Sequence, residues 1–345
     1  MYKINISSRT LHFLRPAGTS RGVYTTRKSY YVTLSDTNQP DVVGIGECAT
    51  LPDLSCDAMS DEEYEQKLRS FCDDFCHTGV IDIDAMRPYP SMLFGLETAK
   101  AQLDVKGSIN FFNTAFGRGE EGITINGLVW MGTFDEMYQR LETKLKAGFR
   151  CVKLKIGAID FEKELDLIRH IRQTFTRKQV ELRVDANGAF APEDAMQRLE
   201  ALAQYDIHSI EQPIRQHQWQ EMARLCTDSP LPIALDEELI GVNNPTEKAL
   251  LLDTIHPQYI ILKPSLHGGM TGTREWITIA RERNIDSWIT SALESNIGLN
   301  AIAQLTADIY GPNITTPQGL GTGQLFTDNI PMPLEIRGDQ LWISD

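Results

Sequence analysis

Short apolar runs alternate with longer amphipathic segments over the second two-thirds of the chain. The short runs are nearly continuous, as in CVKLKIG at 151–157, which is typical of parallel strands buried on both faces. The segments between them carry Glu, Lys, Arg and Gln on one side, as surface helices do. The predicted helices are 134–147, 165–174, 195–205, 218–226, 245–252, 273–283 and 298–310. This alternation predicts a (β/α) barrel whose first strand is 123–132 and whose last turn is PQGLGTG at 317–323.

The first part of the chain has a different pattern, with strands followed by helices. Strands are predicted at 2–14, 23–34 and 42–49, with the Gly-rich loop PAGTSRG and Arg21 between the first two. Helices are predicted at 61–76, behind a Ser60 N-cap, and at 91–106, before Gly107. This order predicts an α+β domain at 1–115, a barrel at 116–324, and a C-terminal segment, 325–345, with a short hairpin that completes the first domain.

Charged residues stand at the C-terminal ends of the predicted barrel strands. They are Lys153, Lys155, Asp185, Glu211, Asp236 and Lys263. Successive strand ends are roughly 25 to 30 residues apart, the length of one strand and its return helix, so these charges are expected in one ring on one face. Three carboxylates so placed would repel one another unless a cation lies among them, and the flanking lysines suit an acid/base pair.

Composition narrows the classes of partner. The 345-residue chain has a net charge of −14, which argues against a nucleic acid or an anionic membrane as its partner. No apolar run reaches the length of a membrane span and the N-terminus lacks a continuous apolar h-region, so we expect a cytoplasmic protein. The six cysteines show no disulfide-framework spacing and are expected to be reduced.

The predicted ring suits carboxylate chemistry. Mg²⁺ prefers hard oxygen ligands, and a substrate carboxylate bound to it would have a more acidic α-proton, because the cation stabilises the enediolate. A lysine acting as the base at neutral pH needs a lowered pKa, from burial, a neighbouring ammonium or the metal. Lys153 lies two residues from Lys155 and therefore on the same side of the strand.

Six motifs in this part of the chain resemble the enolase superfamily, in its muconate-lactonising-enzyme-like branch. They are KLK at 153–155, VDANGAF at 184–190, IEQP at 210–213, LDEE at 235–238, LKPS at 262–265 with GG at 268–269, and SALESNIG at 291–298. Within that branch the chain most resembles the o-succinylbenzoate synthases. The resemblance implies a modified (β/α)7β TIM-type barrel with an α+β N-terminal capping domain.

The resemblance also implies residue roles. Lys155 would be the general base, Lys263 the cation on the opposite face of the substrate, and Lys153 the support of Lys155. Asp185, Glu211 and Asp236 would bind Mg²⁺, with Mn²⁺ as a substitute. Asn187, Glu237 and Glu294 would orient these groups, although Glu294 also suits pairing with a lysine. The predicted substrate-binding residues are Ser20, Arg21, Leu51, Asn187, Ser291, Leu293, Gly321 and Thr322.

The implied activity is the syn dehydration of 2-succinyl-6-hydroxy-2,4-cyclohexadiene-1-carboxylate to 2-succinylbenzoate, a step of menaquinone synthesis. The partner would be this small carboxylate, in a monomer or homo-oligomer. No Asp-x-Asp sequence occurs between Asn313 and Gln324, which disfavours a dipeptide epimerase. An N-acylamino acid racemase stays open because it uses the same lysine pair, and so does a non-catalytic metabolite-binding homologue.

Overall fold

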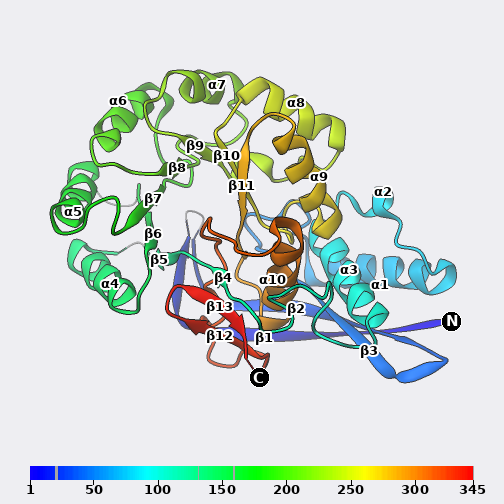
Figure 1. Ribbon diagram of the computed structural model, residues 1–345. Coiled ribbons are helices and arrows are strands. Elements are labelled where there is room, and N and C mark those ends of the chain that lie inside the picture. The colour runs from blue at the N-terminus through cyan, green and yellow to red at the C-terminus, as the bar shows by residue number, and fades with distance from the viewer. Residues whose placement is uncertain (20–21, 131, 158–159, 345) are drawn as a thin grey trace.

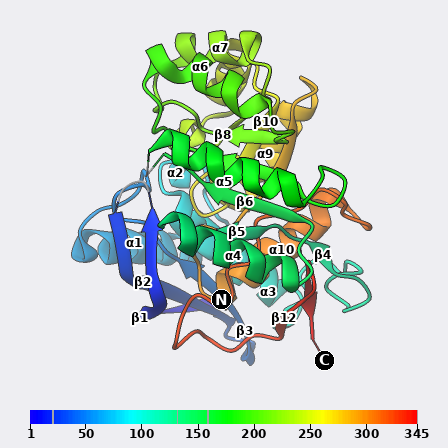
Figure 2. The same cartoon turned by 90° about the vertical axis from the view of Figure 1, so that its left-hand side faces the viewer.

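The N-terminal part of the molecule is an antiparallel sheet covered by helices (Figures 1 and 2). The computed structural model describes residues 1–19, 22–130, 132–157 and 160–344. The sheet has the order β1-β2-β3, and its strands are β1 (Tyr2–Thr19), β2 (Gly22–Asp36) and β3 (Gln39–Cys48). These strands confirm the three predicted from alternation, but the first two are longer than expected.

The predicted loop PAGTSRG is largely strand. After a register shift between His12 and Ala17, β1 continues to pair with β2, as far as Thr19 opposite Gly22. The prediction of a loop was wrong because Pro16 and the glycines interrupt the alternation in the sequence without ending the pairing. Ser20 and Arg21, which were predicted to bind substrate, lie outside the described residues.

Three helices follow the sheet, namely α1 (Asp61–Thr78), α2 (Ile83–Met86) and α3 (Pro90–Asp104). The predicted Ser60 cap is confirmed, since Ser60 and Glu63 form a reciprocal capping box. Helix α3 packs directly on the sheet at Gly46, where an added Cβ would lie 1.7 Å from the carbonyl oxygen of Gly95. Only glycine permits so close an approach of strand and helix.

The barrel is a ring of parallel strands with helices outside it, curving through green to orange in Figure 1. Its strands, hydrogen-bonded in chain order, are β5 (Gly127–Val129), β6 (Cys151–Lys155), β7 (Glu181–Asp185), β8 (Ser209–Glu211), β9 (Ile233–Leu235), β10 (Tyr259–Leu262) and β11 (Asp286–Ile289). Its helices are α4 (Phe134–Lys146), α5 (Phe161–Thr174), α6 (Pro192–Ala203), α7 (Trp219–Asp228), α8 (Pro245–Ile255), α9 (Gly269–Arg281) and α10 (Asn296–Tyr310). A short 3₁₀ helix, η1 (Glu237–Leu239), follows β9.

Two residues of the PQGLGTG segment close the ring. Gln318 forms a parallel bridge with Ile125, and Gly319 forms one with Thr290. The backbone N–H of Gly319 donates to the carbonyl of Ile289 at 2.8 Å. The eighth strand of the barrel is therefore reduced to this pair, and the expected (β/α)7β architecture is confirmed.

The predicted first barrel strand at 123–132 is divided in two. Its beginning, β4 (Ile123–Thr124), pairs with the C-terminal hairpin of β12 (Leu334–Arg337) and β13 (Gln340–Ile343), while β5 joins the barrel. The hairpin itself is confirmed. The division into domains at 115 and 324 stays a prediction.

Carboxylates of the N-terminal part bind the first turns of two barrel helices. Glu47 accepts hydrogen bonds from the backbone N–H groups of Ser295 and Gly298, each at 3.0 Å, where α10 begins. Glu97 accepts from the N–H groups of Met270 and Thr271, at 2.6 and 3.1 Å, where α9 begins. Helix N-termini favour negative charge, so these contacts hold the capping part on the barrel.

Candidate active site

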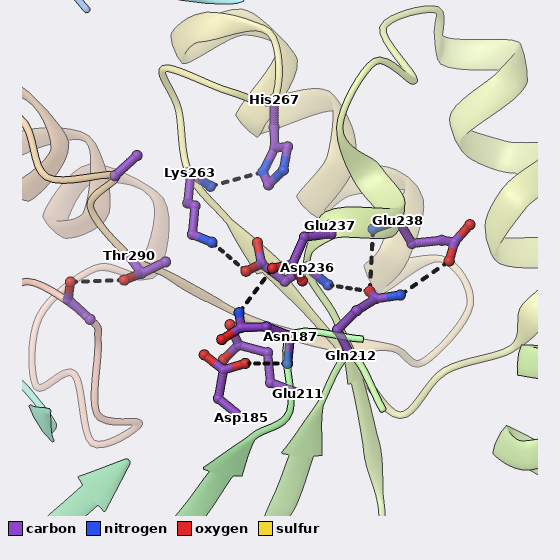
Figure 3. Close-up of polar contacts among 12 residues, drawn as sticks. Asp185, Asn187, Glu211, Gln212, Asp236, Glu237, Glu238, Lys263, His267 and Thr290 are labelled. Atoms are coloured by element: carbon purple, nitrogen blue, oxygen red, sulfur yellow. Dashed lines mark hydrogen bonds and ion pairs between the residues drawn. The ribbon is translucent and has the colours of Figure 1, made fainter. Parts of the chain in front are cut away.

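The charged strand ends meet on one face of the barrel. Lys155 lies opposite Asp185 in the register of β6 and β7, and Asp185 lies opposite Glu211 in that of β7 and β8. Asp236 directly follows β9, and Lys263 directly follows β10. Figure 3 shows Asp185, Glu211, Asp236 and Lys263 gathered at the ends of their strands. The predicted ring of charges is thus a consequence of register in a parallel sheet.

Lysines link the carboxylates. The Lys153 ammonium donates to Asp185 at 3.1 Å and to Glu211 at 2.8 Å. The Lys155 ammonium donates to Asp185 at 3.0 Å and to the side-chain oxygen of Asn187 at 2.7 Å. Lys263 forms an ion pair with Asp236. Lys153 and Lys155 share an oxygen of Asp185, as expected for residues on the same side of one strand.

The two principal lysines stand on opposite sides of the ring. Lys155 ends β6 and Lys263 follows β10, and the three carboxylates come from β7, β8 and β9 between them. Counting the Gln318–Gly319 segment as the eighth strand, β6 and β10 lie halfway around the barrel from each other. A substrate in the middle would have one amine on each face.

Burial and crowding set the protonation of the carboxylates. Burial and the charge of Asp185 raise the pKa of Glu211 to about 8. Burial also raises the pKa of Asp236, against the opposing effect of Lys263. For Asp185 burial acts in the same direction, but Lys153 and Lys155 outweigh it and hold its pKa below the usual range.

The pKa values of Lys153 and Lys263 are raised by the carboxylates around them. Burial alone lowers the pKa of Lys153, yet Asp185 and Glu211 reverse this, and its pKa lies above the ordinary value. The pKa of Lys263 is raised in the same way by Asp236 and Glu237. The carboxylates therefore hold these ammonium groups charged, and a lower pKa would require the carboxylate charge to be taken up by another cation.

Three buried carboxylate oxygens at the ring have no hydrogen-bond donor among the described residues and are therefore available to such a cation. Glu211 Oε1, Asp236 Oδ1 and Glu237 Oε2 are buried and accept no hydrogen bond within the described part of the chain. Buried carboxylate oxygens without a donor cost free energy unless they are paired with a positive charge. Among the described residues no three His, Cys, Asp or Glu side chains are already arranged to hold a metal, because lysine ammonium groups lie between the carboxylates. The donor set fits a hard divalent cation that would replace those ammonium contacts.

Neighbouring polar groups contact the ring. Asn187 donates to Glu237 at 2.9 Å, and the orienting role expected of both stays a prediction. Two residues outside the predicted site also make contact: Gln212 accepts from the backbone N–H of Asp236 at 3.2 Å, and His267 accepts from that of Lys263 at 2.9 Å. Gln212 belongs to the IEQP motif, which is the signal that would have identified it.

A pocket opens above the ring. It is lined by the predicted residues Leu51, Lys153, Lys155, Asp185, Asn187, Glu211, Glu237, Lys263, Ser291, Leu293, Gly321 and Thr322. Asp236 lies beneath it, fully buried. The wall also contains residues that the predictions omitted, namely Tyr24, Leu54, Asn126, Leu128, Trp130, Thr290, Ala292 and Gly319. Trp130 directly follows strand β5, and that position was the signal available in the sequence.

Glu294 forms no ion pair with a lysine of the described residues. Its carboxylate accepts from the Ser265 hydroxyl and from the backbone N–H of Ala292, the latter at 2.7 Å. The alternative of charge neutralisation by a lysine was therefore wrong. Glu294 is buried beside the pocket wall and holds the backbone there.

Comparison with known proteins agrees with this architecture. The family described as enolase C-terminal domain-like matches residues 136–344. This chain belongs to that family, in the enolase superfamily, as its motifs predicted.

Relatives define the group more narrowly. The chain is 48% identical to o-succinylbenzoate synthase of Desulfotalea psychrophila, over 97% of each chain. The crystal structure of MenC from D. psychrophila LSv54 superposes with a TM-score of 0.85 at 43% identity, covering 99% of both chains. In contrast, the L-Ala-D/L-Glu epimerase of Bacillus subtilis is 27% identical over 50% of this chain and 47% of its own. The predicted likeness to the o-succinylbenzoate synthase group is confirmed.

Proposed function

We propose that this chain is a lyase that dehydrates 2-succinyl-6-hydroxy-2,4-cyclohexadiene-1-carboxylate to 2-succinylbenzoate. The observation that carries the proposal is the pair of lysines, Lys155 and Lys263, which line one pocket on opposite sides of the ring that holds three buried carboxylates. Identity of 48% over nearly the whole chain to an o-succinylbenzoate synthase supports the same reaction. A lysine base acting beside Mg²⁺ is the established chemistry of this superfamily.

The proposed metal is Mg²⁺, with Mn²⁺ as a substitute. Asp185, Glu211 and Asp236 would hold it, because their oxygens are buried, convergent and in part without donors. When bound, the cation would fix the substrate carboxylate and stabilise the negative charge that develops on its oxygens. Asn187 and Glu237 would orient these groups.

Lys155 is the proposed general base and acid. With its carboxylate contact weakened, its neutral amine would take the proton from the carbon bearing the substrate carboxylate. The resulting ammonium would then give a proton to the hydroxyl that leaves from the same face, so that water departs and the ring becomes aromatic. A single residue serving both steps accounts for a syn elimination.

Lys263 is proposed to remain charged on the opposite face. Its position halfway around the barrel from Lys155, across the three carboxylates, suits electrostatic stabilisation of the charge that develops on the substrate. Lys153, between Asp185 and Glu211, would keep Lys155 in place and favour its neutral form by like charge.

An ultraviolet assay tests the proposal. The purified chain with Mg²⁺ and the cyclohexadiene carboxylate is expected to form the aromatic product, and excess chelator is expected to stop its formation. Racemisation of an N-acylamino acid, followed by polarimetry, tests the alternative activity of the same lysine pair. Turnover of neither compound would contradict the proposal and leave a metabolite-binding homologue.

Location and assembly are separate matters. Within the described ranges, no helix is both long enough and apolar enough to cross a membrane. The cytoplasmic location, and the choice between monomer and homo-oligomer, stay predictions.

A further inference from the structure

One buried arginine joins two segments of the pocket wall. Arg27, on β2 of the capping part, is 4% exposed. One of its terminal nitrogens donates to the carbonyl of Ala292, and the other donates to the carbonyl of Ala49 at 3.1 Å. Ala49 leads into Leu51 of the capping part, and Ala292 precedes Leu293 of the barrel, and both leucines line the pocket. A single guanidinium group thus fixes two walls that come from different parts of the fold.

The barrel segment needs such support. Leu293 has a φ of 66°, in the left-handed region, which costs a residue with a Cβ roughly 1–3 kcal/mol. On one side of the strained turn, Glu294 accepts from the backbone N–H of Ala292 at 2.7 Å and from the hydroxyl of Ser265. Arg27 donates to the Ala292 carbonyl, which belongs to the next peptide group, the one that joins Ala292 to Leu293. Both polar groups of Ala292 are therefore fixed by buried charged side chains.

The two walls meet in an apolar cluster beside the ring of charges. Its buried members are Leu11, Phe13, Ala17, Leu51, Leu266, Ala292, Leu293 and Phe326. None of these side chains carries a group that could transfer a proton or bind a metal. This side of the pocket is suited to contact the carbon skeleton of a substrate whose carboxylate lies at the ring.

We propose that Arg27 is a positioning residue that sets the substrate-binding wall formed by Leu51 and Leu293. The inference rests on the proposed function, because it concerns the same pocket. Arg27 binds two carbonyl oxygens from diverging nitrogens of one rigid plane, which a lysine ammonium on a flexible chain reproduces only in part. Its removal frees the strained turn and separates the walls, while leaving Lys155, Lys263 and the carboxylates in place.

Arg87 provides a matched control. It also lies in the capping part, and its guanidinium makes two hydrogen bonds to Glu275 on α9, each 2.9 Å long. Arg87 therefore crosses between the two parts of the molecule as Arg27 does, but its partners Asp84, Asn243 and Glu275 do not line the pocket, whereas Ala292 does. If Arg27 served only to hold the parts together, replacement of either arginine would have the same effect on catalysis.

The test is steady-state kinetics of the Mg²⁺-loaded full chain with the cyclohexadiene carboxylate, together with a thermal unfolding midpoint for each variant. Arg27→Met is expected to raise KM by about tenfold or more while kcat changes by less than about threefold, since the lost interaction concerns binding. Arg27→Lys is expected to recover part of that loss. Arg87→Met is expected to lower the unfolding midpoint and to leave KM within about twofold of the wild-type value.

A fourth variant keeps the inference testable if Arg27→Met does not fold. Leu293→Asn retains Arg27 and a residue type that tolerates positive φ, but it removes the apolar side chain, so KM is expected to rise with kcat nearly unchanged. Unchanged KM in both Arg27→Lys and Leu293→Asn would overturn the inference, as would an equal rise of KM in Arg87→Met. A wild-type chain without turnover would instead contradict the proposed function.

Discussion

Lys155 is the residue on which the proposed chemistry depends most. It is nearly buried at the end of β6 and contacts both Asp185 and Asn187. Those contacts hold the amine toward the centre of the ring, where a substrate proton would be presented. This position makes Lys155 a candidate base. The reaction would start when its amine leaves the Asp185 carboxylate and contacts the substrate instead.

Replacement of Lys155 by alanine is expected to lower kcat by about 10³-fold, because the amine proposed to take the substrate proton is removed. Substrate affinity, measured by titration calorimetry, is expected to stay within about threefold, since the other binding groups remain. Lys178→Ala, at an exposed position, is the control and is expected to leave both values unchanged. Activity that persists in Lys155→Ala would show that the base is another residue.

Asp236 is expected to be a metal ligand, and its replacement tests the ring directly. Asp236→Asn is expected to raise the Mg²⁺ concentration needed for half-maximal activity by about tenfold or more, because a charged hard ligand becomes a neutral one. Glu238→Gln is the matched control, since Glu238 is equally buried and two residues away. It binds Gln212 and the backbone of His217 instead of the ring. Equal metal titrations for the two variants would remove Asp236 from the ligand set.

At the scale of elements, two barrel helices and one helix of the capping part are capped by carboxylates distant in sequence. The N-cap positions of α3 and α9 are Tyr89 and Gly268, and neither provides a side-chain cap. Asp57 serves α3, where it accepts from the backbone N–H of Ser91 at 2.9 Å, and Glu97 serves α9. Such caps satisfy N–H groups that would otherwise be unpaired at the buried end of a helix.

Loss of the Glu97 cap is expected to destabilise the chain. Glu97→Ala leaves two backbone N–H groups at the start of α9 without an acceptor, which is expected to cost about 1–3 kcal/mol in urea denaturation. Glu65→Ala is the control, because Glu65 forms an exposed pair with Arg69 worth less than about 1 kcal/mol. Similar losses in both variants would contradict a capping role for Glu97.

Elements with a local signal were predicted well, and those that depend on distant partners were not. The capping box of Ser60 and Glu63 lies within four residues of sequence. The barrel strands are likewise predicted by continuous apolar runs in the sequence. The Gln318–Gly319 strand is too short to have a periodicity, and its existence depends on Ile125 and Thr290. The Arg27 contacts likewise join residues far apart in sequence, so no local pattern marks them.

At the scale of the whole molecule, the active pocket is a joint product of the capping part and the barrel. The barrel supplies the charged ring through strand register, while Tyr24, Leu51 and Leu54 of the capping part supply one wall. The motifs predicted the ring because charge at a strand end is visible in the sequence. Residues of the wall were predicted only where the family resemblance implied them. An apolar side chain at a pocket wall does not differ in the sequence from an apolar side chain in the core.

Buried acids of the capping part make the stability of the molecule depend on pH. Burial raises the pKa of Asp57 to about 6, against the lowering effect of its bonds to Ser91. Between about pH 4 and 6 the unfolded chain releases this proton and the folded chain keeps it, so stability falls as pH rises through this window. The loss is complete above the folded pKa and amounts to up to about 3 kcal/mol.

Urea denaturation of Asp57→Asn across this range isolates the effect. The wild-type free energy of unfolding is expected to fall, relative to that of the variant, as pH rises from about 4 to 6, and the difference is expected to level off above that range. Parallel pH profiles for the two proteins would show that Asp57 titrates normally in the folded state.

Three strand ends are proposed to hold one divalent cation, with one amine on each side of the bound substrate. A crystal structure of the chain with Mg²⁺ and 2-succinylbenzoate measures this directly. We expect a single ion with oxygens of Asp185, Glu211 and Asp236 at about 2.1 Å, and the amines of Lys155 and Lys263 on opposite faces of the bound product. An ion bound elsewhere, or lysines still paired with the carboxylates around an empty centre, would contradict it.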